Sequence, residues 1–461
     1  MSVSVRSATP ALAALLGAAL AAFVLTDPPG GRWAVHTTGR ELDRWLSAQP
    51  TGIAIGAVLA ALACVLLQRG GSRRLAWIVA AAGAAVVAGV RAAVSEVAGV
   101  DALIALHLVK TAAGGVVLGA AVAAVWGHPL AQRALAVGAV GGFLSVSAYG
   151  TGTSWESTST LGEPAWWLLG VTIAAVAAAA ATANPASRIQ RVTAPEARVA
   201  LLSIAALALL NRLQTTWIGS DETGTRTQQW ITVAVAMVVI LVATEVCARM
   251  IARHTGTPDG AVVLVTTGVA AAAMPVLVDL RSPFRDVPAW AAVTVAGLAV
   301  VAGLAVAARR PAPVAGLAVA VAVPVIGAIW PDFGGDGPWL LVRLAVVGAG
   351  AGLAVGSALP GSAAVAAAGL AIPFVSMVFH AAATVIDPRD STVIVFEGAY
   401  QPLTGVATAR TYESDLQRVF EQHGRAVLDF PRYDDRIAGI ALTLAVVFCA
   451  WGVRSLRQAQ R

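Results

Sequence analysis

Charge, lysine and cysteine are all scarce in this sequence of 461 residues. Charged residues make up 12% of the chain, about half of the roughly 25% found in soluble proteins, which excludes an ordinary water-soluble domain. The three cysteines lie inside apolar stretches, without the spacing of a zinc or disulfide framework. No glycine loop followed by Lys-Ser/Thr is present to bind phosphates. We therefore expect no metal, no cofactor, no catalytic residues and no enzymatic activity.

Apolar residues are abundant instead: they make up 58% of the chain, and the mean hydropathy is +0.77. They occur in repeated blocks of about 17–22 residues, the length an α-helix needs to cross a bilayer. The pattern predicts an all-α polytopic membrane protein with about fourteen transmembrane helices. The predicted spans are residues 9–26, 52–68, 75–95, 102–126, 134–150, 165–182, 197–213, 229–249, 260–278, 288–308, 313–330, 338–358, 362–385 and 437–453.

The arginines predict the orientation of these spans, because basic residues are retained in cytoplasmic loops. With the N-terminus inside, the inner segments contain fifteen arginines and two acids, whereas the outer ones before residue 386 contain six arginines and thirteen acids. We therefore expect a multi-pass protein of the cell membrane with both termini in the cytoplasm. The net charge of +6 then reflects topology, and we expect membrane lipid, not nucleic acid, as a partner. The first block lacks a signal-peptide cleavage site and is predicted to be a retained span.

The predicted fourth span contains the one lysine of the chain, Lys110, beside thirty arginines. Lys110 lies about 12 Å into that span and is expected near the membrane midplane, with His107 one helical turn earlier on the same face. A desolvated lysine can lose its proton and histidine titrates near neutral pH, so both are candidates for substrate or proton binding. Asp27 is the third candidate. The alternative for Lys110 is a structural ion pair with an acid such as Asp27.

Other ionisable residues in the apolar blocks have simpler explanations. Arg91, Arg212 and Arg343 lie near predicted outer ends of spans, where a long side chain can reach the interface. Glu245 and Arg249 are four residues apart and can pair with each other.

Four short motifs along residues 27–150 resemble those of the fourteen-span drug:proton antiporters of the major facilitator superfamily. Asp27 precedes a Gly-Arg-Glu-Leu run at 39–42 by the family's interval, and the basic loop at 68–73 is similar to the family's loop between spans two and three. The run at 107–111 in span four and the glycine-rich entry to span five at 133–142 are also similar. In place of the family's loop acid stands Gln68, and in place of its buried arginine stands His107.

The resemblance implies two six-helix bundles plus two inserted helices. The implied divisions are 1–182 for the N-terminal bundle, 183–250 for the inserted pair, and 251–461 for the C-terminal bundle, which includes an outer loop at 386–436. It also implies structural or gating roles for Arg69, Arg73, Gly141 and Gly142, and a mid-membrane cavity lined by spans one, four and five.

The predicted function is a secondary transporter, an exporter of an amphipathic or lipid-like small molecule that works by alternating access and is coupled to protons. One alternative is a non-transporting, transporter-like scaffold that binds an envelope protein partner through the loop at 386–436. A second alternative is a polytopic glycosyltransferase that uses lipid-linked sugars, with an outer acid such as Asp43 as its base.

Overall fold

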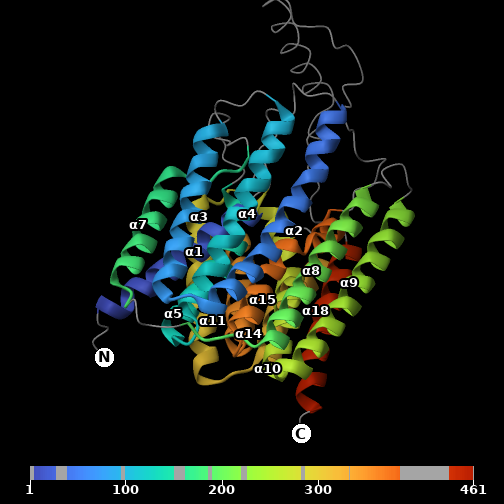
Figure 1. The fold of residues 1–461 in the computed structure, drawn as a ribbon. Coiled ribbons are helices and arrows are strands. Elements are labelled where there is room, and N and C mark those ends of the chain that lie inside the picture. The colour runs from blue at the N-terminus through green and yellow to red at the C-terminus, as the bar shows by residue number, and fades with distance from the viewer. Residues whose placement is uncertain are drawn as a thin grey trace, which may run out of the picture.

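The structure is a computed structural model that describes residues 5–26, 39–94, 99–149, 161–184, 189–219, 226–281, 286–331, 333–384 and 436–459. Asp27 and nearly all of the predicted outer loop at 386–436 lie outside these residues, whereas Asp43 belongs to the helix that begins at Gly39. Every described element longer than an isolated turn or bridge is helical, and the helices run side by side as one array (Figure 1).

The first six predicted spans correspond to the helices that begin the chain. These are α1 (Val5–Thr26), α2 (Gly39–Gly70), α3 (Arg73–Val94), α4 (Val100–Val125), the composite helix α5 (Pro129–Ala136), η2 (Val137–Gly141), α6 (Gly142–Ser145) and η3 (Val146–Ala148), and α7 (Trp166–Thr182). Two helices follow, α8 (Ala194–Gly219) and α9 (Arg226–Thr255).

The last six spans correspond to the remaining helices, two of which are interrupted. They are α10 (Thr257–Leu280), α11 (Ala289–Arg309), α12 (Pro313–Ala320) with α13 (Ala322–Ile329), α14 (Gly337–Ser357), α15 (Ala363–Val375) with α16 (Met377–Ala383), and α18 (Arg436–Gln458). Among the described residues, twelve helices are long and apolar enough to cross a membrane, and Trp166–Thr182 and Pro313–Ile329 are shorter apolar helices. The predicted all-α polytopic membrane fold is confirmed.

The closest helix packing is made by glycines. A Cβ atom on Gly115 or Gly119 of α4 would lie 2.0 Å from the carbonyl oxygen of Gly56 or Ala60 on α2. On α14, a Cβ atom on Gly352 would lie 2.3 Å from the carbonyl oxygen of Val300 on α11. Small residues let helix backbones approach closely in a membrane, where no hydrophobic effect drives the association of helices.

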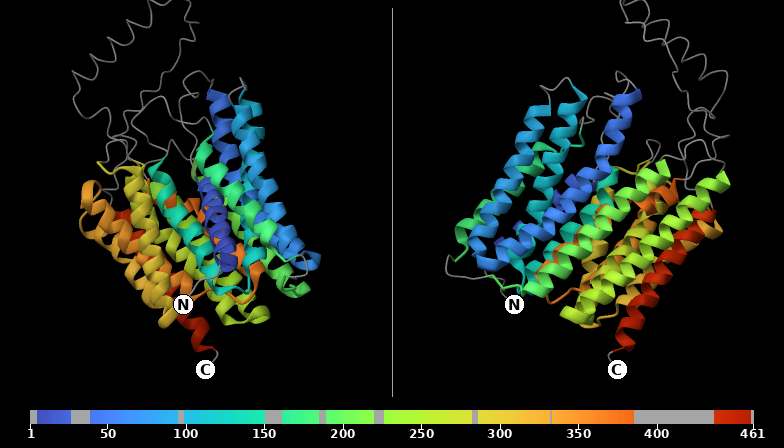
Figure 2. Two further views of the ribbon diagram at one scale, coloured as in Figure 1. Left: turned by 90° about the vertical axis from the view of Figure 1, so that its left-hand side faces the viewer. Right: turned by 45° about the vertical axis from the view of Figure 1, so that its right-hand side comes forward.

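The first six spans and the last six meet along a junction between two sets of helices. Helix α15 contacts α2 and α4, while α11 contacts η2 and α6. Helix α8 contacts both α2 and α15, and α9 contacts α10 and α18, so the two inserted helices lie at one side of this junction (Figure 2). The division of the chain at residues 182 and 250 stays a prediction, and α9 itself continues to Thr255.

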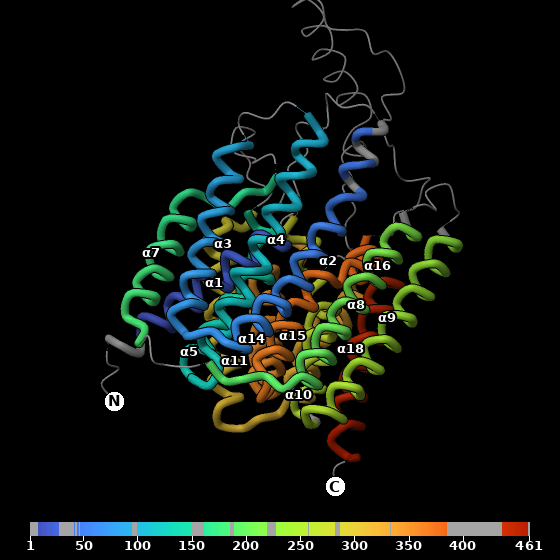
Figure 3. The backbone as a smooth tube through the Cα atoms, in the orientation of Figure 1, coloured from blue at the N-terminus to red at the C-terminus, as the bar shows by residue number. Residues whose placement is uncertain are grey.

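The two ends of the helix array differ in composition. Helix α1 begins and α18 ends at the same end (Figure 1), as an even number of crossings requires. Arg44 and Arg436 are exposed at the opposite end, but more exposed arginines lie at this end: Arg69, Arg74, Arg133, Arg191, Arg198, Arg253, Arg309, Arg310, Arg454 and Arg457. Of the seven exposed tryptophans among the described residues, Trp451 lies in the C-terminal half of α18, and six lie at the opposite helix ends: Trp166, Trp167, Trp217, Trp290, Trp330 and Trp339. Tryptophan is enriched at membrane–water interfaces, so these rings mark the interface at the end away from the termini. Helices α2, α3 and α4 extend furthest at that end (Figure 3).

Candidate functional site

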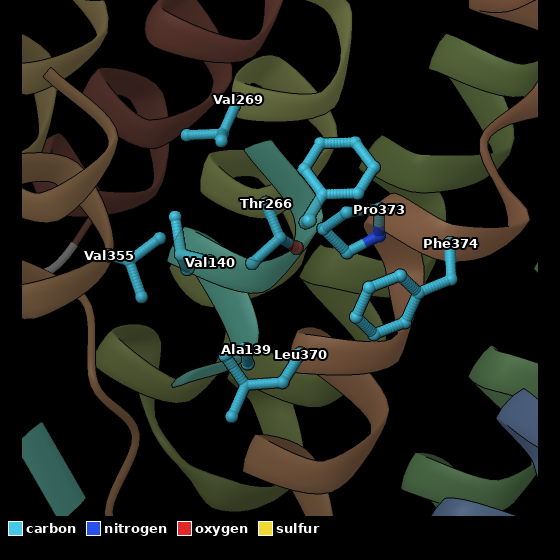
Figure 4. Close-up of a pocket in the computed structure, with 9 residues that line it drawn as sticks. Ala139, Val140, Thr266, Val269, Val355, Leu370, Pro373 and Phe374 are labelled. Carbon is cyan, nitrogen blue, oxygen red and sulfur yellow. The ribbon is translucent and has the colours of Figure 1, made fainter. Parts of the chain in front are cut away.

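A small cavity lies where the two sets of six spans meet. Both sets contribute to its lining: Ala139, Val140, Phe143, Thr266, Val269, Val355, Leu370, Pro373 and Phe374. Figure 4 shows the labelled side chains gathered between helices of both sets. The cavity measures about 10 Å³, enough for about one water molecule. Its one polar side chain, Thr266, donates its hydroxyl to the carbonyl of Val262 on its own helix at 2.8 Å.

Two of the helices that line this cavity are irregular beside it. Ala139 and Val140 belong to η2, a π-helical turn inside the fifth span. Pro373 lies near the end of α15, and the chain bends at Ser376 before α16 begins. Single π-helical turns occur frequently at functional sites, and proline removes one backbone donor from a helix. Both features interrupt the regular α-helical hydrogen bonding close to the cavity.

The cavity is flanked by contacts towards both ends of the array. Further along the spans, away from the termini, the rings of Phe143 and Phe374 make an edge contact with centroids 5.8 Å apart. At the end that holds the termini, the indole N–H of Trp126 donates to the Gly361 carbonyl at 3.1 Å, and the Gly361 N–H donates to Oδ1 of Asp259 at 2.6 Å. We call Trp126, Gly361 and Asp259 the inner latch. Contacts between the two sets therefore lie on both sides of the cavity.

Lys110 does not line this cavity. Its side chain is fully buried, and its ammonium group donates to the carbonyls of Leu161 and Gly162 in the segment that precedes α7. Beside it, Arg91 donates to the carbonyls of Glu163 and Pro164.

Four successive carbonyls, from residues 161 to 164, therefore accept hydrogen bonds from two cations, and all four residues are buried. We call residues 161–164 the carbonyl segment. Glu163 accepts a hydrogen bond from the Leu161 N–H at 3.0 Å. Glu163 could not be recognised from the sequence as a buried residue, because nothing in the sequence distinguishes a buried acid in a loop from an exposed one.

His107 contacts a different part of the protein from Lys110, namely helix α2. Its Nε2 atom lies 3.3 Å from the carbonyl oxygen of Gln49, and its ring packs against Trp45 with centroids 5.5 Å apart. Gln49 is the third residue of the apolar span that begins at Ser47. The imidazole is therefore near the end of the membrane span, not at its centre. The Nδ1 atom is buried without a hydrogen-bond partner among the described residues.

The residues of the basic loop are separated in the structure. Arg69 is exposed, while Arg73 donates a hydrogen bond to Nε2 of His128 in the turn between α4 and α5. Loss of hydration lowers the pKa of the His128 imidazole, and the positive charge of Arg73 lowers it further. The neutral imidazole thus acts as the acceptor for Arg73. Gln68 is buried and donates to the carbonyl of Gln190 at 3.0 Å, which ties α2 to the segment before α8.

Gly141 and Gly142 face different neighbours. A Cβ atom on Gly141 would lie 3.7 Å from the Cα atom of Gly297 on α11, so Gly141 is at the junction of the two sets. A Cβ atom on Gly142 would lie 2.8 Å from the Cβ atom of Ala22 on α1. Of the two glycines, Gly141 is therefore the one that faces the last six spans, beside the residues that line the cavity.

Arg343 corrects one expectation from the sequence. We expected it to reach the membrane interface, yet only 3% of the residue is exposed and its guanidinium pairs with Asp279 of α10 at 2.6 Å. It also donates to the carbonyls of Gly334, at 2.9 Å, and Phe333, at 3.4 Å. Asp279 was missed because the sequence assigned it to an outer loop. The expected Glu245–Arg249 pair is present at 2.8 Å.

The surroundings of Lys110 and Arg343 are similar in sequence as well as in structure. Leu-Val-Lys at 108–110 and Leu-Val-Arg at 341–343 are each followed five residues later by a glycine that packs closely on a neighbouring helix. Each cation donates to two successive carbonyls, the second from a glycine with positive φ, Gly162 at 64° or Gly334 at 71°. Helices α4 and α14 therefore occupy comparable places in the two sets.

Comparison with known proteins places the chain in no family: no family model matches it, and no curated protein sequence matches it. Within the described residues, no group of three or more His, Cys, Asp or Glu side chains could hold a metal ion.

Proposed function

We propose that this membrane protein is a secondary transporter that works by alternating access around the cavity between its two sets of six spans. The observation that carries the proposal is that both sets line one cavity and that contacts between the sets lie on both sides of it. Substrate sites of secondary transporters lie at such junctions and use discontinuous helices. The π-helical turn η2 and the bend at Ser376 supply that discontinuity.

The lining indicates the class of substrate. Eight of the nine lining residues are apolar, and the ninth, Thr266, offers a single hydroxyl. An opened cavity of this composition suits an amphipathic or lipid-like small molecule, because a strongly charged solute would lose its hydration without gaining partners. The six spans, two inserted helices and six further spans are in the order expected for a fourteen-span member of the major facilitator superfamily, to which we propose the chain belongs. The exposed arginines favour a protein of the cell membrane with both termini in the cytoplasm. Export is the direction of transport that we propose.

The contacts of the predicted site residues indicate a different role for each of them. Lys110 holds the carbonyl segment, so we propose a positioning role for it instead of direct contact with substrate. His107, with its unpartnered Nδ1 atom, and Asp27, which lies outside the described residues, remain candidates for proton exchange. Their test is loss of pH-dependent transport in His107→Ala and Asp27→Asn.

Labelling of a cysteine inside the cavity tests alternating access without a known substrate. In Val140→Cys, the new thiol is buried in the lining of the cavity, because Val140 is 5% exposed. If the protein alternates, a membrane-impermeant maleimide should label it in both right-side-out and inverted vesicles. The wild-type chain is the matched control, because its three native thiols are buried. Labelling from neither side would contradict the proposal and favour the non-transporting scaffold.

A further inference from the structure

The ion pair between Asp279 and Arg343 joins two helices that line the cavity. Asp279 is on α10, which contributes Thr266 and Val269 to the lining, and Arg343 is on α14, which contributes Val355. The pair lies near the other end of both helices, away from the termini. Making or breaking this ion pair therefore changes how α10 and α14 are held together, at a distance from the cavity itself.

Asp279 is close to the surface of the array. It is the last residue but one of α10, and 9% of it is exposed. The loop before α14 covers it: a Cβ atom on Gly335 would lie 3.8 Å from Oδ1 of Asp279. Because glycine has no side chain, the backbone of Gly335 packs directly against this carboxylate.

Arg343 does not depend on Asp279 alone. Its guanidinium also donates to the carbonyls of Gly334 and Phe333. Removing one partner of a buried ion pair is usually costly, because the other charge is left without compensation. Here the carbonyls would continue to solvate the cation after Asp279 lost its charge, so the ion pair can break without removing all acceptors from Arg343.

We propose that Asp279 is a proton-binding site whose protonation breaks the ion pair with Arg343 and so alters the closure of the cavity. The carboxylate oxygen takes a proton from water at the end away from the termini and forms an O–H bond; no electrons are transferred. The charged groups that act on it are Arg343, which pairs with it, and Asp336 just before α14; two residues further along, Arg281 contacts His380 of α16. The Nη1 atom of Arg281 lies 3.2 Å from the Nε2 atom of His380. The link to the cavity rests on the proposed function, whereas the proton site itself does not.

Infrared difference spectroscopy of the purified full chain in lipid vesicles, acidic minus neutral pH, tests the site directly. We expect a carbonyl band of a protonated carboxylic acid that is lost in Asp279→Asn and retained in Asp259→Asn. Asp259 is the matched control, because it is an aspartate on the same helix that bonds to a backbone N–H instead of a cation. A band that persists in Asp279→Asn would overturn the proposal. Because that variant could misfold, thermal unfolding of Arg343→Gln/Asp279→Asn should recover most of the stability lost in each single variant.

The link to the cavity is tested in the Val140→Cys background. Acidic pH on the side away from the termini should shift the ratio of labelling between the two vesicle orientations at least twofold, and Asp279→Asn should abolish this pH dependence. An unchanged pH dependence in Asp279→Asn would overturn the link. If Val140→Cys is labelled from neither side while the infrared band depends on Asp279, the proton site stands and the proposed transport function is wrong.

Discussion

Trp126 and Gly361 are 235 residues apart in the sequence, yet the indole N–H of Trp126 donates to the carbonyl of Gly361 at 3.1 Å. Trp126 ends α4 of the first set of spans, and Gly361 precedes α15 of the last set. Gly361 in turn donates its N–H to Asp259 at the start of α10. The two sets are thus joined at the end that holds the termini by hydrogen bonds that a relative movement of the sets would break.

Trp126→Phe should weaken this inner latch, because phenylalanine keeps an aromatic ring but has no N–H donor. One hydrogen bond contributes about 1 kcal/mol net, which corresponds to a roughly fivefold change in the population of the open state. We expect faster maleimide labelling of Val140→Cys from the side of the termini and unchanged labelling from the other side. Equal acceleration from both sides would indicate general loosening instead of a gate.

Lys110→Met should destabilise the protein, because the buried carbonyls of Leu161 and Gly162 would lose their donor. Each unsatisfied buried carbonyl costs about 1–3 kcal/mol. Lys110→Arg keeps a cation with several donors and should retain most of the stability. The measurement is thermal unfolding in detergent, followed by tryptophan fluorescence. A Lys110→Met variant as stable as wild type would contradict the role of Lys110 in holding the carbonyl segment.

Gly141→Ala and Gly142→Ala form a matched pair of adjacent substitutions. The new methyl group at 142 would lie 2.8 Å from the Cβ atom of Ala22, so α1 and α6 must separate, at a cost of about 1–3 kcal/mol. At 141 the nearest atom is 3.7 Å away, an ordinary contact, and replacing glycine in a helix gains about 0.5–1 kcal/mol. We expect a lower unfolding temperature for Gly142→Ala only. A lower unfolding temperature for Gly141→Ala than for Gly142→Ala would show that α1 packs on the fifth span differently from the packing described.

The Arg73–His128 contact predicts a dependence of stability on pH. The folded-state pKa of His128 is lowered, so the folded protein binds a proton less readily than the unfolded chain, in which histidine has a pKa near 6.5. This contribution to stability is present above about pH 6.5 and decreases as the pH falls below that value. Unfolding temperatures at neutral and mildly acidic pH should therefore differ less in His128→Gln than in wild type. An identical difference in the two proteins would exclude the contribution of His128.

The amino-acid sequence was sufficient for the number and placement of the spans. Each of the fourteen predicted spans coincides with a helix or an interrupted helix of the structure, because the length of an apolar block and its flanking charges are local properties of the chain. The expected pair of Glu245 and Arg249 was also predictable, since residues four apart on a helix are neighbours.

The tertiary structure alone decided what each buried polar group contacts. Lys110 and His107 are one turn apart, yet one reaches the carbonyl segment and the other reaches α2. Asp279 pairs with Arg343, which follows it by 64 residues in the sequence. The cavity is lined by residues from four separate spans. Apolar length determines that a helix enters the membrane, whereas the neighbours of its side chains depend on which helices pack against it, and glycine-rich surfaces such as those of α4 and α14 permit that packing without specifying the partner in the sequence.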